Sequence, residues 1–472
     1  MTNPGGSATT GWTYNVPPSA SNSTLTIAAS IIPQNTTTSL TATIKNSSGN
    51  PLANDLVTFT SSKTSVATAP TAITNSNGVA TTTVTGIFPG TATITASADG
   101  TNVSQTATVT VTAPDVSVGS SQTGLIATLT FTSPGTLGST LALSQRASNT
   151  DFTYDSSTCS AGTAYPSGAN CKVTYSFNPK APGLRLGAIV METNSGTVLG
   201  TTYVSGIGVG PQAEVFPGAS TSIPTSGEIA TNVVTDALGN VFYGGAYTGV
   251  YKWSIGATTS VTDVDIYGLA VDGAGNLLLS TNGFNGTVAG VYELINGTGA
   301  PKTIVTFSNS ETPSGNMAFD GFGNLYVPLT NEIGKTAAGT NVMTTITAPS
   351  GAVVSGLAVD SAGDVFFVDN AHGNMDEIAA GGTSVTTVAA GLSNAYGVAV
   401  DAAGNLYVSS FNAMQRLAAG TYAQTSLTGL RGYDLSIDSS GTLWMAQLSG
   451  VVEENRTVGA TLSFSSDGGV EV

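Results

Sequence analysis

LAVDGAGNLLLS, residues 269–280, is the stretch that decides the fold, because its pattern returns in the second half of the chain. MAFDGFGNLYVP, LAVDSAGDVFFV and VAVDAAGNLYVS follow it at residues 317–328, 357–368 and 398–409. An acid that keeps returning before a glycine indicates either a ring of catalytic or metal-binding carboxylates, or one turn structure used again and again. The spacing of the copies and the residues around them separate these two interpretations.

The repeated acids are spaced like the blades of a propeller. They are Asp236, Asp272, Asp320, Asp360, Asp401 and Asp438. The intervals of 36, 48, 40, 41 and 37 residues are close to the length of one four-stranded blade. After each Asp come two residues, a Gly, a position that is mostly Asn or Asp, and an apolar strand. Six copies therefore predict an all-β fold in which residues 211–472 form a six-bladed β-propeller.

The local chemistry around the repeated Asp favours a turn. An Asp at the end of one strand, followed by two residues, Gly and Asn, is typical of a short hairpin loop. Gly supplies a positive φ, and the carboxylate can accept hydrogen bonds from N–H groups of the turn. Every blade needs this hairpin, whereas a catalytic site has no reason to be sixfold. We therefore expect the six acids to be structural, so that Asp401→Ala lowers stability and leaves ligand binding intact.

The repeat also carries a family resemblance. The pattern G-[LV]-A-V-D-x-x-G-N-[LV]-[YF]-V is similar to the NHL repeat and to the wider class of propellers that includes streptogramin lyase and gluconolactonase-like enzymes. The resemblance implies the propeller architecture. It does not imply one activity, because the same fold carries hydrolases, lyases and binding platforms.

Length and composition indicate about three domains built from strands. The chain has 472 residues, of which 8% are charged and 40% hydrophobic, with 58 Gly. Abundant Thr, Ser, Val and Gly are typical of strands and turns. Residues 1–22 resemble a flexible Pro/Gly/Ser/Thr linker without a signal peptide, and the chain contains no apolar run long enough for a membrane helix. The sequence is compatible with a fragment of a longer exported protein.

Residues 23–113 are predicted to form a β-sandwich. LTATI, TATITA and TATVTVT alternate apolar and small polar residues with a period of two, as in a sheet with one buried face. The phrases SLTATIKNSSGNPLANDLVTFTSS and NSNGVATTTVTG resemble the bacterial Ig-like domain of the invasin and intimin group. The resemblance implies a stalk module that spaces and displays other domains.

Residues 114–210 are predicted to form a second Ig-like sandwich. They contain both cysteines of the chain, Cys159 and Cys171. A pair this close favours one structural disulfide in an exported protein, with two unrelated buried thiols as the alternative. The phrases FTYDSSTCS and GANCKVTYSFNPKAPGLRLGAIVM resemble Ig-like modules of the choice-of-anchor D type. The resemblance again implies a structural or interaction module.

Charge excludes two classes of partner. Residues 1–210 hold six acids and six bases, so all of the net charge of −16 lies beyond residue 210. A surface of this sign repels nucleic acid and anionic membranes. We therefore expect no nucleic acid partner and no direct membrane insertion.

Catalytic and metal chemistry has little support in the sequence. His372 is the single histidine, which excludes a multi-histidine metal site, and the repeat places it in the loop between the second and third strands of the fourth blade. We predict no catalytic residue and no cofactor. A Ca²⁺ site made of Asp, Glu and Asn oxygens stays compatible with the residue types, as in gluconolactonase-like propellers.

Candidate ligand contacts come from the positions where the copies differ. Four and five residues before each repeated Asp, the inner strands are expected to open toward the axial channel. These positions give the candidate ring of Asn232, Asn316, Asp434, Tyr267, Tyr396 and Tyr433. Tyrosine offers an aromatic face and a hydrogen-bonding tip, so the hypothesis is a ligand-facing surface. The alternative is that the tyrosines pack between blades.

The expected function is non-enzymatic adhesion or recognition, in which an Ig-like stalk presents a propeller that binds a protein or a carbohydrate. The alternative is a propeller hydrolase or lyase, gluconolactonase-like or streptogramin lyase-like, that carries accessory Ig-like domains. We expect a monomer that is secreted or held at a bacterial cell surface. Two segments are candidates for closing the propeller, residues 213–218 and residues 460–466.

Overall fold

The computed structural model describes residues 16–63, 66–210, 220–223, 230–246, 248–254, 257–283, 288–308, 311–401, 403–410, 413–427, 430–438, 441–447 and 450–454. The chain divides into two compact units, Met1–Ala113 and Pro114–Val472. Regular structure in the described part is almost entirely β-strand, joined by one short 3-10 turn, η2 (Ile295–Gly297). Among these residues, no helix has the length and apolar character of a membrane span.

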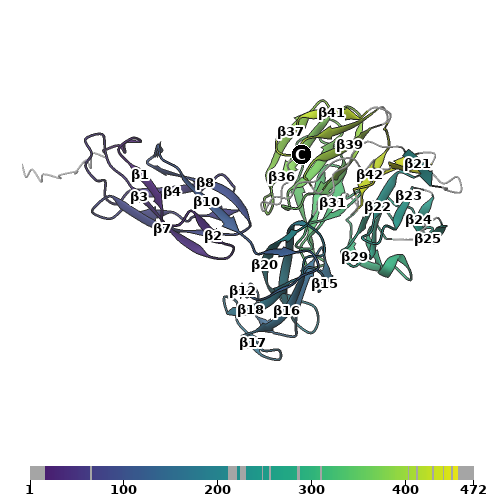
Figure 1. Ribbon diagram of the computed structural model, residues 1–472, viewed down its shortest axis with the longest axis horizontal. Helices are drawn as coiled ribbons and strands as arrows, with labels where there is room; N and C mark the ends of the chain where they lie inside the picture. Colours follow the sequence, from purple (N-terminus) through teal and green to yellow (C-terminus); the bar gives the residue numbers. More distant parts are fainter. Residues whose placement is uncertain are drawn as a thin grey trace, which may run out of the picture. The chain divides into compact units, whose positions relative to one another are not determined.

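The first unit contains two sheets (Figure 1). One consists, in order across the sheet, of β1 (Thr24–Ile27), β3 (Thr37–Thr43), β7 (Val79–Gly86) and β5 (Ala67–Thr68). The other consists of β2 (Ile31–Pro33), β10 (Ala107–Thr112), β8 (Gly90–Ala98), β4 (Leu56–Ser61) and β6 (Ala72–Ile73), with β9 (Thr101–Asn102) paired to β8. Alternating residues such as Leu40, Val57 and Ile94 are fully buried in one core between the sheets. The period-two pattern of the sequence therefore produces a sandwich with hydroxyl-rich outer faces.

The N-terminal border of this unit differs from the predicted linker. Residues 1–15 lie outside the described residues. Pro18 forms a bridge with Asn46, and the Ser19 amide donates to the Lys45 carbonyl at 2.7 Å. The Asn22 side chain donates to the Asn46 carbonyl at 3.1 Å. The segment from Pro18 to Asn22 is thus attached to the sandwich by hydrogen bonds.

The second unit begins with another sandwich-like region. Its larger sheet consists of β11 (Asp115–Ser117), β20 (Val198–Val209), β19 (Gly183–Glu192), β14 (Ser139–Ser144) and β15 (Ala147–Ser148). The smaller sheets are β12 (Gln122–Thr130), β18 (Asn170–Phe177) and β16 (Phe152–Ser157), and the pair β13 (Gly135–Thr136) and β17 (Ala164–Tyr165). Phe131, Phe152 and Phe177 are buried in its core. We call this region, residues 114–210, the second sandwich.

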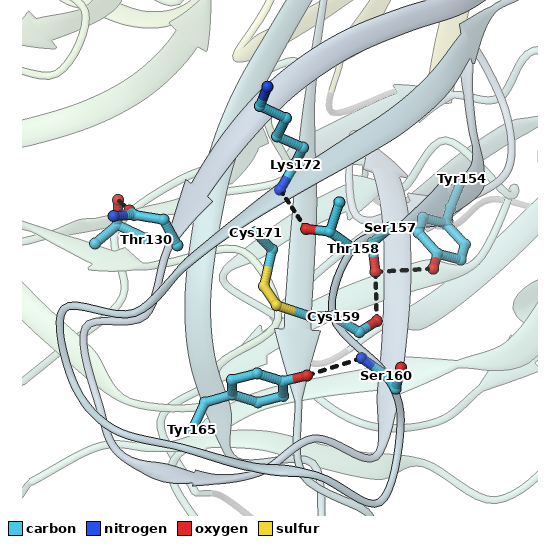
Figure 2. The surroundings of a disulfide bond; sticks show 10 residues. Thr130, Tyr154, Ser157, Thr158, Cys159, Ser160, Tyr165, Cys171 and Lys172 are labelled. Atoms are coloured by element: carbon cyan, nitrogen blue, oxygen red, sulfur yellow. Dashed lines mark hydrogen bonds between the residues drawn. A yellow bond between two sulfur atoms is a disulfide. The ribbon is translucent and has the colours of Figure 1, made fainter.

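The two cysteines form a disulfide, as the sequence predicted. Cys171 lies in β18 and Cys159 follows β16, the antiparallel neighbour of β18, with the two Cα atoms 5.6 Å apart. Figure 2 shows the bond surrounded by hydrogen bonds, including the Ser157 hydroxyl donating to the Cys159 carbonyl at 2.6 Å and the Ser160 amide donating to the Tyr165 hydroxyl at 2.9 Å. The disulfide therefore fixes the segment that leaves β16 against the core strand β18.

Six four-stranded antiparallel sheets follow within the described residues, and Figure 1 shows them from teal to yellow. The first three sheets are β22 (Asn232–Thr235), β23 (Val241–Gly245), β24 (Gly249–Ser254), β25 (Ala257–Thr262); β26 (Gly268–Val271), β27 (Leu277–Thr281), β28 (Gly290–Leu294), β29 (Lys302–Thr306); and β30 (Ala318–Phe319), β31 (Leu325–Leu329), β32 (Glu332–Thr336), β33 (Met343–Thr347). The next three are β34 (Val354–Val359), β35 (Val365–Asp369), β36 (Asn374–Ile378), β37 (Val385–Ala390); β38 (Ala395–Val400), β39 (Leu406–Ser410), β40 (Met414–Leu417), β41 (Gln424–Leu427); and β42 (Asp434–Ile437), β43 (Leu443–Gln447), β44 (Gly450–Glu454), β21 (Ser220–Ile223).

These sheets form a closed, propeller-like ring, which we call the ring. The first strand of each sheet contacts the first strand of the next, and β42 contacts β22. Strand β21 closes the ring by pairing antiparallel with β44, so a segment from the start of the repeat region completes the last sheet. The two closing segments proposed from the sequence, 213–218 and 460–466, lie outside the described residues.

The repeated Asp residues hold the turn between the first and second strand of each sheet. The Asp272 carboxylate accepts from the amides of Ala274 and Asn276, both at 2.9 Å, and from the Asn276 side chain at 2.9 Å. The Asp401 carboxylate makes the corresponding three bonds with Ala403 and Asn405, and also accepts from the Tyr407 hydroxyl at 3.1 Å. The glycine of every turn has a positive φ, between 79° and 91°: Gly239, Gly275, Gly323, Gly363, Gly404 and Gly441. We call the side of the ring that carries these turns the turn end.

The second sandwich covers part of the turn end. The Gln145 amide donates to the Gly321 carbonyl at 3.1 Å, and the Gln145 carbonyl accepts from the Gly273 amide at 3.0 Å. Leu143, Ala188 and Val190 of the sandwich share a buried cluster with Ala338 of the ring. This contact is both apolar and hydrogen-bonded, and the second sandwich and the ring belong to one compact unit. The predicted domain boundary near residue 210 stays a prediction.

Candidate functional site

The opposite side of the ring, which we call the pocket end, is built from the starts of the inner strands. In three sheets the position four residues before the repeated Asp is glycine: Gly268, Gly356 and Gly397. A Cβ on Gly268 would collide with the Gly315 carbonyl oxygen, and one on Gly356 with the Tyr396 carbonyl oxygen. Neighbouring backbones therefore approach too closely there for any side chain. Asn232, Asn316 and Asp434 occupy the same position in the other three sheets.

The three polar side chains meet and bind one another. The Asn232 amide group donates to Asn316 Oδ1 at 3.1 Å, and the Asn316 amide group donates to Asp434 Oδ2. Asp434 Oδ2 also accepts from the Val233 amide at 2.9 Å, and Asn316 Oδ1 accepts from the Leu269 amide at 2.8 Å. All three residues are buried. They form a polar network across the axis of the ring, and with the bonds from Val233 and Leu269 this network joins four of the six sheets.

The three tyrosines stand around this network. Tyr396 and Tyr433, from neighbouring sheets, have ring centroids 5.9 Å apart and planes inclined at 52°. Tyr267 lies in another sheet, and its hydroxyl accepts from the Asn282 side chain at 2.8 Å. All three tyrosines are half-buried, so part of each ring faces solvent. Burial, and then the neighbouring Tyr396, raise the pKa of Tyr433.

All six candidates from the sequence line one pocket of about 190 Å³. The structure brings these six positions together, because the same register position of each inner strand faces the same point on the axis, and their role as a ligand-facing surface stays a prediction. The sequence pattern overlooked Ser314, which lies one residue before the positions considered and also lines the pocket. Within the described residues the Ser314 hydroxyl is buried and has no hydrogen-bond partner. An unsatisfied buried hydroxyl is uncommon, so Ser314 is a candidate contact for a ligand in this pocket.

Asp434 is the one carboxyl group among the residues that line the pocket. Burial raises its pKa to about 7, against the opposing effect of the hydrogen bonds from Val233, Leu435 and Asn316. Charge on this group is therefore disfavoured at neutral pH, because no base among the lining residues compensates it.

A Ca²⁺ ion fits these residues poorly. Calcium takes six to eight oxygen ligands, usually with several carboxylates. The pocket supplies one carboxyl group and two amides whose N–H groups already point at the neighbouring oxygens. Among the described residues, no group of three or more His, Cys, Asp or Glu side chains is arranged to hold a metal. The chemistry of the pocket is therefore that of hydrogen bonding and aromatic contact.

His372 lies in the loop between β35 and β36, the second and third strands of the fourth sheet, where the repeat places it. Its Nδ1 is 2.5 Å from Asp369 Oδ2. Hydrogen bonds from His372 and from the Val353 amide hold the pKa of Asp369 below its usual value despite burial. The pair is not among the residues that line the pocket.

Similarity to known proteins is confined to one domain family and to folds. Residues 2–112 match the bacterial Ig-like domain (group 1) family. None of the curated proteins matches the chain. Virginiamycin B lyase from Staphylococcus aureus is a similar solved structure, 12% identical with a TM-score of 0.39, over 71% of this chain and 99% of that chain.

Two further solved structures are similar at the same level. Regucalcin from Agrobacterium tumefaciens, described as a calcium-binding protein, is 15% identical with a TM-score of 0.42, over 52% of this chain and 95% of that chain. A gluconolactonase from Xanthomonas campestris is 12% identical with a TM-score of 0.40, over 52% of this chain and 97% of that chain. Scores this low transfer no activity, so the function is inferred from the residues of the pocket.

Proposed function

We propose that this chain is a secreted or surface-held bacterial recognition protein, in which an Ig-like stalk presents a six-bladed, NHL-type propeller that binds a protein or a glycan at its pocket end. The stalk comprises an invasin/intimin-type domain over residues 23–113 and a second Ig-like domain of the choice-of-anchor D type over residues 114–210. The match of residues 2–112 to a bacterial Ig-like family and the disulfide both support export, since disulfides persist in oxidising compartments.

One observation carries the proposal: the polar residues of the pocket are bonded to each other and not arranged for chemistry. A nucleophile and its base must lie within hydrogen-bond reach of each other and of a reacting atom. Asp434 and Asn316 bind each other and the backbone of the first and second sheets. The half-buried tyrosines around them are suited to contact with a ligand.

The second candidate function is a hydrolase or lyase. The observation that favours it is the pKa of about 7 for Asp434, which is suitable for a general acid or base. A turnover assay of the full chain with gluconolactone and with virginiamycin B distinguishes the two, and turnover that Asp434→Asn abolishes would support the enzyme.

The binding proposal is tested by replacing Tyr267, Tyr396 and Tyr433 with Ala together in the full chain. We expect at least a tenfold loss of binding to glycan arrays and to intact cells, measured by fluorescence. Tyr292→Ala is the matched control, because Tyr292 belongs to β28 and does not line the pocket. Unchanged binding by a folded triple variant would contradict the proposal.

A further inference from the structure

The residues that line the pocket are suited to an uncharged ligand. They carry hydroxyl, amide and aromatic groups, and none is Lys, Arg, His or Glu. A cation would have only Asp434, whose Oδ2 already accepts from Val233 and Asn316. An anion would find no basic side chain in the pocket. The pocket also lies beyond residue 210, in the part of the chain that holds the whole net charge of −16, and this charge repels anions.

The aromatic pair provides a surface for a ring with two different sides. Tyr396 and Tyr433 are inclined at 52° with ring centroids 5.9 Å apart, so the two rings meet as a wedge, and both line the pocket. The C–H face of a saturated ring can pack against such a wedge, while groups on the edge of that ring reach the polar network. A sugar has this combination of an apolar face and a polar edge.

The hydroxyl of Ser314 is also suited to a sugar. Its oxygen is buried and has no partner within the described residues, although its backbone amide donates to the Pro328 carbonyl at 3.1 Å. A buried hydroxyl without a partner is destabilising. A ligand hydroxyl can both donate to it and accept from it.

The volume limits the size of the ligand. At about 190 Å³ the pocket is smaller than the roughly 300–1,000 Å³ of sites for drug-sized molecules. A pocket of this size has room for about one small ring. A longer ligand would place one end residue inside and the rest in solvent.

We propose that the pocket binds the terminal residue of a neutral glycan, with the sugar face on Tyr396 and Tyr433 and its hydroxyls bonded to Ser314 and the edge of the polar network. This inference rests on the proposed function, and it specifies the ligand class of the same pocket.

Matched sugar pairs test the charge requirement. The full chain is applied to immobilised oligosaccharides that end in glucose or galactose, and to the same oligosaccharides ending in glucuronic or galacturonic acid. We expect binding to at least one neutral terminus and at least tenfold weaker binding to its uronic acid counterpart. Equal or tighter binding to the uronic acids would overturn the inference.

Two substitutions test the named contacts. Tyr396→Ala should weaken neutral glycan binding at least tenfold, whereas Tyr396→Phe, which keeps the ring, should change it less than threefold. Ser314→Ala should weaken binding several-fold without lowering the melting temperature, because its hydroxyl has no partner in the protein. Tyr292→Ala again serves as the control. A Ser314→Ala variant with unchanged affinity contradicts the assigned contact.

The inference and the proposed function fail in different ways. If no neutral glycan binds, but the wild-type chain binds cells and the triple tyrosine variant does not, the sugar assignment is wrong and the recognition function stands. If the wild-type chain binds neither glycans nor cells, both are wrong.

Discussion

At the turn end of the ring, a buried Asp is bonded to its own loop in copy after copy, while at the pocket end one buried Asp is bonded to residues of two other sheets. Asp401 accepts from groups two, four and six residues ahead of it in the chain. Asp434 accepts from Val233, which is 201 residues away in sequence. An Asp carboxyl group thus stabilises a local turn at one end of the ring and connects residues distant in sequence at the other.

The fourth sheet sharpens this comparison, because its turn departs from its neighbours. In the third and fifth sheets, the side-chain amides of Asn324 and Asn405 donate to the repeated Asp. The fourth sheet has Asp364 at the equivalent position. Asp364 still accepts from the Ala380 amide at 2.7 Å, as Asn405 accepts from Ala419. It cannot donate to Asp360, and burial together with the repulsion from Asp364 raises the pKa of Asp360 to about 7.

The largest expected effect is that of Asp434→Ala. The change leaves the buried N–H groups of Val233 and Asn316 without an acceptor and should lower the free energy of unfolding by about 3 to 4 kcal/mol. Chemical denaturation followed by tryptophan fluorescence measures this loss of stability, because Trp253 and Trp444 both lie in the propeller-like ring of sheets, with the centroids of their aromatic rings 5.5 Å apart. A loss below that of Asp401→Ala would show that the cross-ring connection is not the stronger one.

Asp401→Ala should lower the free energy of unfolding by about 2 to 3 kcal/mol, because Asn405 and Tyr407 lose a buried acceptor. The loss of a single capping hydrogen bond at a helix end costs less, about 1 kcal/mol. Glycan and cell binding should stay at the wild-type level, because Asp401 does not line the pocket. Abolished binding with unchanged stability would assign the repeated acids a ligand role.

Asp364→Asn should raise the free energy of unfolding by about 1 to 2 kcal/mol at pH 8, because it restores the donor to Asp360 and keeps the acceptor for Ala380. The pKa of Asp360 is raised, so its ionisation lowers stability as pH rises through about 7. The gain from the substitution should therefore shrink below pH 7. Unfolding curves at pH 5 and pH 8 measure it, and Asn405→Asp is the matched reverse variant, expected to be destabilising.

The smallest effect is expected from Asp434→Asn, about 1 kcal/mol. Since burial raises the pKa of Asp434 from its ordinary 3.8 to about 7, the wild-type chain loses stability as the pH rises between these two values and levels off above pH 7. The amide removes this titration while its oxygen can still accept from Val233. In the Asp364→Asn background, the remaining loss of stability between pH 5 and pH 7 should become smaller when Asp434→Asn is added. An unchanged loss in the double variant would place the titration elsewhere.

The repeating unit, its turn and the register positions of the candidate ring could be predicted from local patterns in the sequence. Local interactions explain this, since Asp, Gly and Asn act within five residues, and a period of two selects the face of each strand. The pairing of Cys159 with Cys171 was also accessible, because the two residues lie close together in the chain.

The contacts that these ring positions make depend on the folded arrangement of the sheets. Asn232, Asn316 and Asp434 could have been three separate ligand groups, but the close approach of the inner strands makes them bond one another. The unpartnered hydroxyl of Ser314, the contact of the second sandwich with the turn end and the closing strand β21 likewise depend on distant segments meeting. No local pattern encodes these contacts, because each is fixed by how the six sheets close around one axis.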